Sequence, residues 1–348
     1  MKQPKTDAAD AGGRTVDRRG ILQASAALAA GGAVSGLGTA PAAAQAKPAI
    51  KAEEFWAAKG DVKLYIYRKR LVGGPPKKPV LFLVHGSTPS SRGSYDLQVP
   101  GSAKGREYSV MDNMAALGFD VWTMDHEGYG RSTHTNNHCG IMTGVEDLKA
   151  ALPVVEKATG QKSVMMYGQS SGAIRAGALA IAEPARVERL ILDAFTYTGT
   201  DAPEIERRRK AADGYRANPK RKVSLATYLS IFNRDKPGTY EPIVAQALAD
   251  EELRHGDTVP SGTYLDMAVN MPMVDPKKLQ CPVCIIRAEH DGNASEAELL
   301  EFFKLLPNPD KQFMFLAGLT HAGTMGLNRH RILHVMHAFL TYPPLRTA

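Results

Sequence analysis

Residues 168–172, with the sequence GQSSG, follow the pattern G-x-S-x-G and are the segment most suggestive of chemistry. They lie between an apolar run typical of a strand, 163–167, and a stretch typical of a helix, 171–182. A strand that turns directly into a helix makes a tight, strained turn, which requires small residues and presents one side chain at the helix N-terminus. Glycine stands two positions before and two positions after Ser170, so we predict that Ser170, rather than Ser171, is a nucleophile.

A serine hydroxyl is a weak nucleophile at neutral pH and needs a base, together with a carboxylate that holds the base in the right tautomer. Two downstream loops supply these groups, since Asp291 follows a predicted strand at 283–287 and His321 follows one at 312–316. The carboxyl ends of parallel strands lie at one edge of a sheet, where ligands bind. We therefore expect Ser170, Asp291 and His321 to converge as nucleophile, acid and base.

A second group of side chains, His126, His134, His138 and Cys139, lies within 14 residues and raises the alternative of a metal site. His134 and His138 would share one side of a helix. The Ser, Thr and Asn residues around them are typical of a loop, however, where this spacing carries little information. We expect no metal or other cofactor, and we expect these histidines to lie at the surface or in a substrate pocket.

The elements that must position these residues repeat as strand and then helix. Strand-like runs occupy residues 62–68, 80–84, 119–124, 163–167, 189–192, 283–287 and 312–316, and helix-like stretches occupy 110–117, 145–157, 171–182, 296–305 and 328–340. This alternation is typical of an α/β protein with a mainly parallel, doubly wound sheet. It breaks at about 196–275, which we interpret as an inserted helical lid.

The composition is that of a globular protein, with 348 residues, 43% hydrophobic and 23% charged, and a formal net charge of +7. Basic residues do not cluster with aromatic ones, so we expect no nucleic-acid partner, and we interpret the run RRRK at 207–210 as a solvated helix face. Cys139, Cys281 and Cys284 are too few for a disulfide scaffold. Cys281 and Cys284 should point to opposite faces of a strand, which indicates packing rather than a shared metal.

The motifs resemble those of the α/β-hydrolase family, in particular its lid-bearing serine esterases and lipases. The matching segments are HGS at 85–87, DHEGYGRS at 125–132, GQSSG at 168–172, and the loops that carry Asp291 and His321. The resemblance covers nearly all of residues 47–348. It implies an oxyanion hole formed by the backbone N–H groups of Ser87 and Ser171.

The acid loop departs from the family pattern, which has Gly where Ala288 stands, so Glu289 stays an alternative acid. Some relatives place the acid at the position of Asp193. Serine at the turn, in place of the aspartate of similar epoxide hydrolases and haloalkane dehalogenases, favours acyl transfer. We expect a small-molecule or polymeric carboxylic ester as substrate. Thioesters, lactones, amides and C–C bonds remain alternatives, ahead of a metal-dependent hydrolase or a non-catalytic binding protein.

Substrate-binding residues cannot be assigned from the sequence. The aromatic and methionine residues of the insertion are expected to form mainly its core, with some at a pocket: Tyr215, Tyr228, Phe232, Tyr264, Met267, Met271 and Met273.

Residues 1–46 resemble a twin-arginine export signal, with Arg18-Arg19 before an Ala- and Gly-rich run and the cleavage pattern AQA at 44–46. The resemblance implies export by the twin-arginine machinery to the periplasm or the exterior. An ordinary secretory signal and an uncleaved anchor are the alternatives. The many glycines and few large apolar side chains argue against a stable membrane span.

Overall fold

The computed structural model describes residues 49–75, 77–101 and 107–344. The interpretation of residues 1–46 as an export signal concerns residues outside these ranges and stays a prediction. Within the described ranges, none of the helices combines the length and the apolar character that crossing a bilayer requires.

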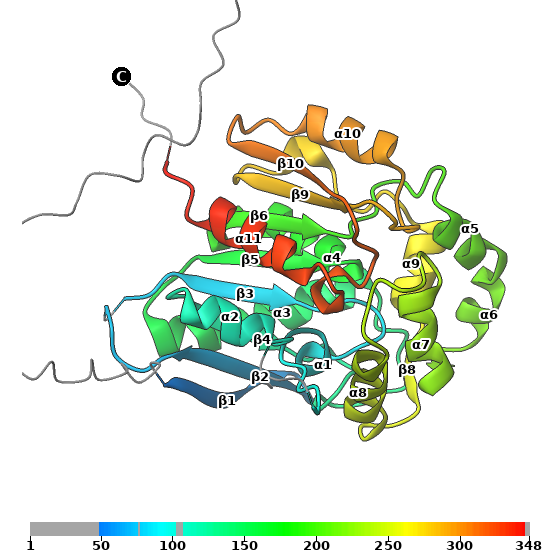
Figure 1. Ribbon diagram of the computed structural model, residues 1–348, viewed down its shortest axis with the longest axis horizontal. Coiled ribbons are helices and arrows are strands. Elements are labelled where there is room, and N and C mark those ends of the chain that lie inside the picture. Colours follow the sequence, from blue (N-terminus) through cyan, green and yellow to red (C-terminus); the bar gives the residue numbers. More distant parts are fainter. Residues whose placement is uncertain (1–48, 76, 102–106, 345–348) are drawn as a thin grey trace, which may run out of the picture. The chain divides into compact units, whose positions relative to one another are not determined.

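Within the described residues, the central sheet has eight strands in the order β1-β2-β4-β3-β5-β6-β9-β10 (Figure 1). Its strands are β1 (Ile50–Lys59), β2 (Val62–Leu71), β3 (Val80–Val84), β4 (Asp120–Met124), β5 (Val164–Gln169), β6 (Val187–Asp193), β9 (Val283–Ala288) and β10 (Lys311–Leu316). Within this sheet β3, β4, β5, β6, β9 and β10 pair in parallel, whereas β1 and β2 join antiparallel. The predicted mainly parallel α/β sheet is therefore confirmed.

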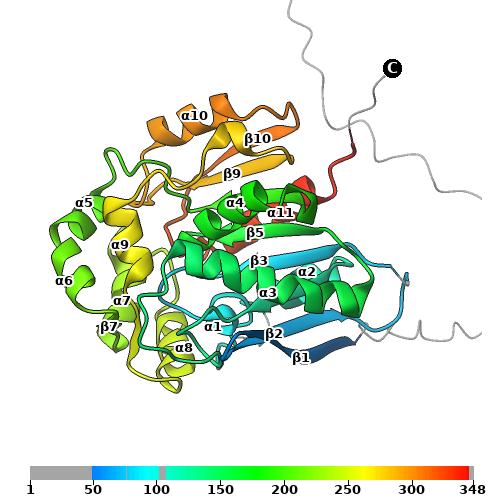
Figure 2. The ribbon, with the colours of Figure 1, turned by 180° about the vertical axis from the view of Figure 1, so that it is seen from behind.

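Helices cover both faces of this sheet. The elements are α1 (Ser91–Tyr95), α2 (Val110–Ala116), α3 (Ile141–Thr159), α4 (Ser171–Ala182), α10 (Glu296–Leu305) and α11 (Arg329–Leu340), with short 3₁₀ turns at Pro184–Arg186, Pro276–Lys278 and Gly323–Met325. Helices α2 and α11 lie on the face seen in Figure 1, and α3, α4 and α10 lie on the face seen in Figure 2.

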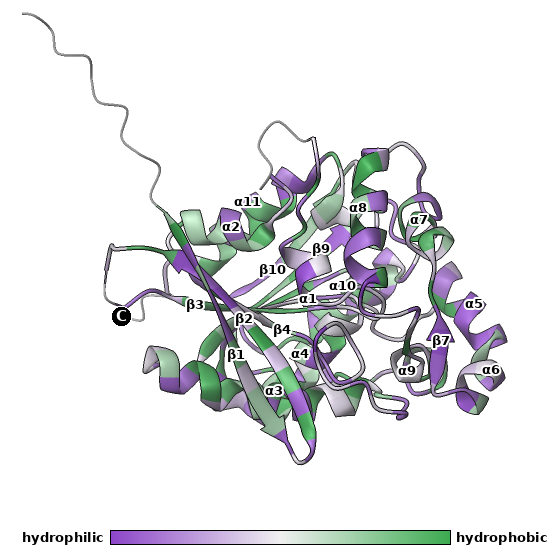
Figure 3. Ribbon diagram, turned by 90° about the horizontal axis from the view of Figure 1, so that it is seen from below, coloured by the Kyte–Doolittle hydropathy of each residue, from purple (hydrophilic) through white to green (hydrophobic). Residues whose placement is uncertain are grey.

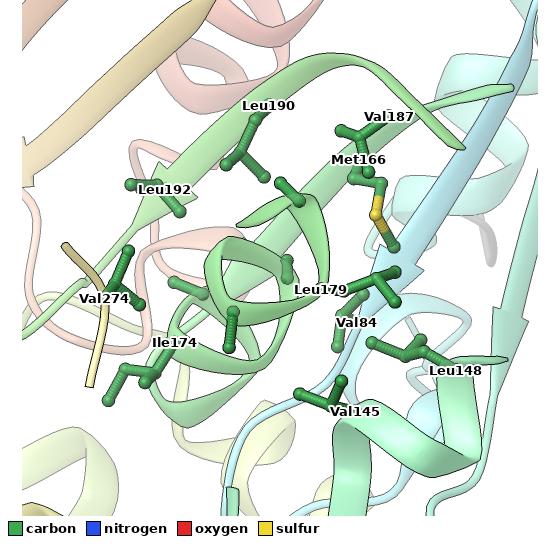
Figure 4. Close-up of a cluster of buried hydrophobic side chains, with 14 of the residues drawn as sticks. Val84, Val145, Leu148, Met166, Ile174, Leu179, Val187, Leu190, Leu192 and Val274 are labelled. Atoms are coloured by element: carbon green, nitrogen blue, oxygen red, sulfur yellow. The ribbon is translucent and has the colours of Figure 1, made fainter. Parts of the chain in front are cut away.

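The side chains of the strands alternate between two hydrophobic cores, as the period of two residues in a strand requires. In β3, Val80, Phe82 and Val84 enter the core under α3 and α4, whereas Leu81 and Leu83 enter the core under α2 and α11. Figure 4 shows the first core, where side chains of β3, β5 and β6 meet apolar side chains of α3 and α4. Burial on both faces explains why these strands are continuous apolar runs.

The three cysteines are free thiols. Cys281 packs against one core and Cys284 lies in the other, which confirms that the two side chains point to opposite faces.

The segment between β6 and β9 carries α5 (Pro203–Lys210), α6 (Ala212–Ala217), α7 (Leu225–Asn233), α8 (Pro242–Leu253) and α9 (Gly262–Val269). It also carries a two-stranded ribbon of β7 (Lys220–Lys222) and β8 (Thr258–Pro260), which the sequence analysis did not predict. The arrowheads of β3, β5 and β6 point toward these helices (Figure 1). Much of α5 is hydrophilic (Figure 3).

Candidate active site

The turn between β5 and α4 presents Ser170. This residue has a φ of 57°, in the left-handed region that non-glycine residues rarely adopt. Glycine is needed on both sides of it, because a Cβ on Gly172 would clash with the backbone oxygen of Val84, and one on Gly168 would clash with the backbone at the start of α4. The packing of α4 against β3 and β5 therefore holds the strained turn in place.

His321 and Asp291 are joined at the same edge of the sheet. Asp291 follows β9, His321 follows the neighbouring strand β10, and the imidazole Nδ1 lies 3.0 Å from each carboxylate oxygen of Asp291. Burial alone would raise the pKa of Asp291. The nearby His321 and the backbone N–H of Asn293 have the larger, opposite effect and lower this pKa to about 2. The ionised carboxylate accepts a hydrogen bond from the Nδ1–H group, which leaves Nε2 unprotonated and available as a base.

Ser170 and His321 line one pocket of about 480 Å³, a volume that includes its open mouth. Within the described residues, no hydrogen bond joins Ser170 Oγ to His321 Nε2, and the amide Nδ2 of Asn293 lies 3.4 Å from Nε2. Contacts between a nucleophile and its base often tighten only when substrate binds. The arrangement can therefore support proton transfer once the serine hydroxyl takes the place of the amide.

The two competing carboxylates have other partners. Glu289 accepts the backbone N–H of Gly318 at 2.7 Å and so supports the loop that leads to the histidine. Asp193 accepts a hydrogen bond from Tyr167, and burial, with the nearby charge of Asp291, raises the pKa of Asp193 to about 7. Of the three carboxylates, Asp291 is the one whose oxygens contact the imidazole in the described part of the chain.

The turn after β3 is held by a buried histidine. His85 accepts the backbone N–H of His126 at Nε2, 3.1 Å away, so its Nδ1 donates to the carbonyl of Gly86 at 2.8 Å. Burial, with the nearby His126 and Arg175, lowers the pKa of His85 well below its usual value, which keeps the ring neutral. The next residue, Ser87, donates from Oγ to Oγ of Ser171 at 2.7 Å.

This contact brings Ser87 and Ser171 together beside the nucleophile. As the first residue of α4, Ser171 has a backbone N–H without an intrahelical partner, and Ser87 lines the pocket. Two serines from separate elements thus flank Ser170, and the Oγ of Ser171 is occupied by Ser87.

The histidines considered as metal ligands are dispersed. His126 lies 3.1 Å from Asp147 in the interior, whereas His134 and His138 contact backbone carbonyls of different segments. Over the described residues, no group of three or more His, Cys, Asp or Glu side chains could hold a metal ion.

Two arginines at the pocket, Arg208 and Arg234, were not predicted from the sequence as site residues. The interpretation of 207–210 as a solvated helix face is wrong for Arg208, which is 1% exposed and lines the pocket. Ile205, one helical turn earlier, is also buried, and this spacing of three is the signal that could have identified the inward face of α5.

The insertion supplies further lining residues. Tyr264 of α9 and Arg234 border the pocket, whereas Tyr228 and Phe232 pack in the core of the insertion. These positions agree with the expectation that the aromatic residues of the insertion form mainly its core, with some at a pocket.

Comparisons with known proteins agree with this architecture. A family model described as serine aminopeptidase, S33, matches residues 101–325. An esterase from Thermogutta terrifontis is 18% identical with a TM-score of 0.61, over 83% of this chain and 98% of that one. A bromoperoxidase from Bacillus anthracis is 19% identical with a TM-score of 0.60, over 83% and 99%. Carboxylesterase CesB from Bacillus subtilis is 17% identical with a TM-score of 0.57, over 84% and 93%.

These three solved structures share the fold of the present chain. None of the curated proteins matches it.

Proposed function

The chain belongs to the S33 serine aminopeptidase family of α/β-hydrolases, and from this premise we propose that it hydrolyses a carboxylic ester through an acyl-enzyme on Ser170. One observation carries the proposal: a strained turn presents Ser170 to the same pocket as His321, whose Nδ1 contacts a buried, ionised Asp291. These are the three groups that acyl transfer by serine requires.

In the proposed reaction, Ser170 Oγ attacks the ester carbonyl carbon while His321 Nε2 takes the hydroxyl proton. The carbonyl oxygen becomes an alkoxide, which the backbone N–H groups of Ser87 and Ser171 stabilise by hydrogen bonds. When the alkoxide collapses, the C–O bond to the alcohol breaks and His321 returns the proton to the leaving oxygen. Water then releases the acid by the same steps, and loss of one oxyanion donor typically costs about 10²- to 10³-fold in rate.

The pocket favours an ester over the N-terminal residue of a peptide. An aminopeptidase must hold the free ammonium group of its substrate, and a carboxylate near the nucleophile serves that purpose. Arg208 and Arg234 line this pocket, and no aspartate or glutamate among the described residues does. Guanidinium groups repel an ammonium group, so we rank ester hydrolysis above the activity that gives the family its name.

We also propose that the insertion at about 196–275 acts as a lid. Its helices supply Arg208, Ile231 and Tyr264 to the wall of the pocket that Ser170 and His321 also line. Movement of these helices would open the pocket to a larger substrate.

A serine-directed fluorophosphonate tests the proposed function. We expect it to label the peptide that contains Ser170, as seen by mass spectrometry, and to abolish hydrolysis of 4-nitrophenyl esters, with EDTA having no effect. Hydrolysis that survives full labelling, or that EDTA removes, would assign the reaction to other residues or to a metal.

A further inference from the structure

A buried positive charge beside the proposed nucleophile lacks a carboxylate partner. Arg208 is 1% exposed and lines the pocket, its Nε has no hydrogen-bond partner, and its Nη1 contacts only the thioether sulfur of Met267, at 3.1 Å, among the described residues. A thioether is a weak acceptor, and a buried charge without a partner is costly. The pocket therefore holds unused capacity to bind an anion.

A second guanidinium group adds to this charge. Arg221 contacts the carbonyl of Ser87 and, at 2.7 Å, Thr88 Oγ1, both at the pocket, while its Nε is buried without a partner. Arg208 and Arg221 lie over the ring of Tyr264, 4.3 and 4.0 Å from its centroid. Neither arginine forms an ion pair with any carboxylate of the described chain.

The charges nearby do not cancel this pair. The carboxylates of Glu204 and Asp235 lie at 3.4 and 3.5 Å from a third arginine, Arg234. Glu204 also pairs with Arg207 at 2.7 Å, and it acts on Arg208 as a nearby charge without forming an ion pair with it. Burial would raise the pKa of Tyr264, but Arg221, Arg208 and Arg234 lower it to about 6. Even a fully ionised Tyr264 supplies one negative charge against two guanidinium groups, so the wall stays positive.

On the basis of the proposed function, we propose that the substrate is an ester that carries a carboxylate, which Arg208 and Arg221 bind while Ser170 attacks the ester carbonyl. A guanidinium group matches a carboxylate in shape and donates two parallel hydrogen bonds to it. Such a contact is stronger than one between neutral groups and fixes the orientation of the substrate. The carboxylate can belong to the acid half, as in a monoester of a dicarboxylic acid, or to the alcohol half.

Two matched pairs of esters distinguish these sources. On the acid side, 4-nitrophenyl hemiglutarate is compared with its methyl ester, and on the alcohol side, 4-acetoxybenzoate is compared with its methyl ester. Each pair differs in a negative charge at nearly constant size. We expect the protein to hydrolyse the charged member of at least one pair with a kcat/KM higher by about tenfold or more, since only the charged member forms charge-assisted hydrogen bonds with the guanidinium groups.

Substitution then assigns the preference to the arginines. Arg208→Gln should reduce this preference to below about threefold, because it lowers kcat/KM for the charged ester more than for the uncharged ester, and Arg208→Lys should restore part of the preference. Arg216→Gln, on the exposed surface of α6, is the matched control and should leave both values unchanged. Arg221→Gln provides a second variant if Arg208→Gln does not fold.

Equal rates for charged and uncharged esters in both pairs would overturn the inference and leave the proposed function standing. The inference would also be overturned if variants at both arginines lowered kcat/KM for the charged and the uncharged ester by the same factor, because a purely structural role gives that result. If none of the four esters is hydrolysed and the fluorophosphonate does not label Ser170, the proposed function fails, and the inference fails with it.

Discussion

At the scale of single residues, three carboxylates near one edge of the sheet differ in role because they differ in contacts. Asp291 faces the imidazole of His321 and is held ionised, with a pKa of about 2. Asp193 accepts a hydrogen bond from Tyr167, and the pKa of Asp193 is raised to about 7, mainly by burial. Glu289 accepts a backbone N–H and is partly exposed. Contact with Nδ1, and not proximity in sequence, is what a histidine base requires of its acid.

The first prediction concerns these three carboxylates. Asp291→Asn should lower kcat by about 10⁴-fold, because an amide at this position favours the wrong imidazole tautomer. Glu289→Gln and Asp193→Asn should lower it by less than about tenfold, since neither residue contacts the ring. Steady-state kinetics of the three variants decide the matter. A nearly normal Asp291→Asn beside an inactive Asp193→Asn would move the acid to the end of β6.

Some residues of the candidate site could be predicted from the sequence, and others could not. Ser170, Asp291 and His321 were predictable as a group because each follows a recognisable strand, and parallel strands end at one edge. Arg208 was not predictable in this way. It lies in a run of four basic residues, the other three of which are exposed or half-buried, and only the tertiary packing of α5 turns it inward.

At the scale of elements, the packing of α4 depends on the absence of side chains at two glycines. Gly172→Ala places a methyl group against the backbone of β3 and should lower the free energy of unfolding by about 1–3 kcal/mol, the usual cost of overpacking. The control is Gly214→Ala in α6, where an added Cβ meets nothing within 4 Å, and which should be neutral or stabilising by up to about 1 kcal/mol. Urea denaturation compares the two, and equal stabilities would contradict the steric account of the turn.

Helix α8 is attached to the sheet part of the protein through a buried carboxylate. Glu252 accepts hydrogen bonds from the backbone N–H and the hydroxyl of Ser90, at 2.8 and 2.7 Å. Burial raises the pKa of Glu252 to about 8, and the nearby Asp125 and Glu251 raise it as well, against the opposing effect of Ser90. The native state therefore retains a proton that the unfolded chain loses at lower pH.

This raised pKa predicts a dependence of stability on pH. The contribution of Glu252 to the free energy of unfolding is fully present below about pH 4.5. It is lost as the pH rises toward about 8, by at most about 1.4 kcal/mol per pH unit. Glu252→Gln should reduce this slope, whereas Asp250→Asn on the exposed face of α8 should leave it unchanged. Urea unfolding at pH 6, 7 and 8 measures the slopes, and identical slopes in the wild type and Glu252→Gln would refute the assignment.

The elements that the sequence did not predict are those with little apolar signal. Strand β1 is an edge strand with most side chains at least partly exposed, and the ribbon of β7 and β8 has strands of three residues each. The buried strands were predictable because burial on both faces leaves a continuous apolar run. Edge strands and short ribbons form because they pair with neighbouring strands, and this pairing cannot be predicted from the local composition.

At the scale of the whole molecule, the site is assembled from segments far apart in the chain. The parallel sheet brings together loops after β3, β5, β9 and β10, and the insertion between β6 and β9 adds Arg208 and Tyr264. The sheet therefore positions the proposed catalytic residues, and the insertion supplies the charge that we propose selects the substrate. The sheet follows general rules of packing and could be predicted, whereas the inward face of the insertion depends on tertiary packing that the local sequence does not indicate.

The N-terminal segment, residues 1–46, bears on where in the cell the whole protein acts. From the arginine pair and the AQA pattern, we propose that residues 1–46 direct export through the twin-arginine machinery. Replacement of Arg18 and Arg19 together by Lys should retain the protein in the cytoplasm, and the exported wild type should begin at Lys47. Cell fractionation and N-terminal sequencing test both statements. Full export of the double variant would indicate an ordinary secretory signal.

The measurement that tests the central claim most directly is the turnover of an ester by Ser170→Ala. The account predicts a folded protein whose kcat is lower by about 10⁴- to 10⁶-fold, with His321→Ala equally severe and the double variant scarcely worse, because the residues act as a unit. Ser171→Ala, which keeps its backbone N–H, should lose no more than about tenfold. A Ser170→Ala variant that keeps more than about a tenth of wild-type activity would contradict the claim that this serine is the nucleophile.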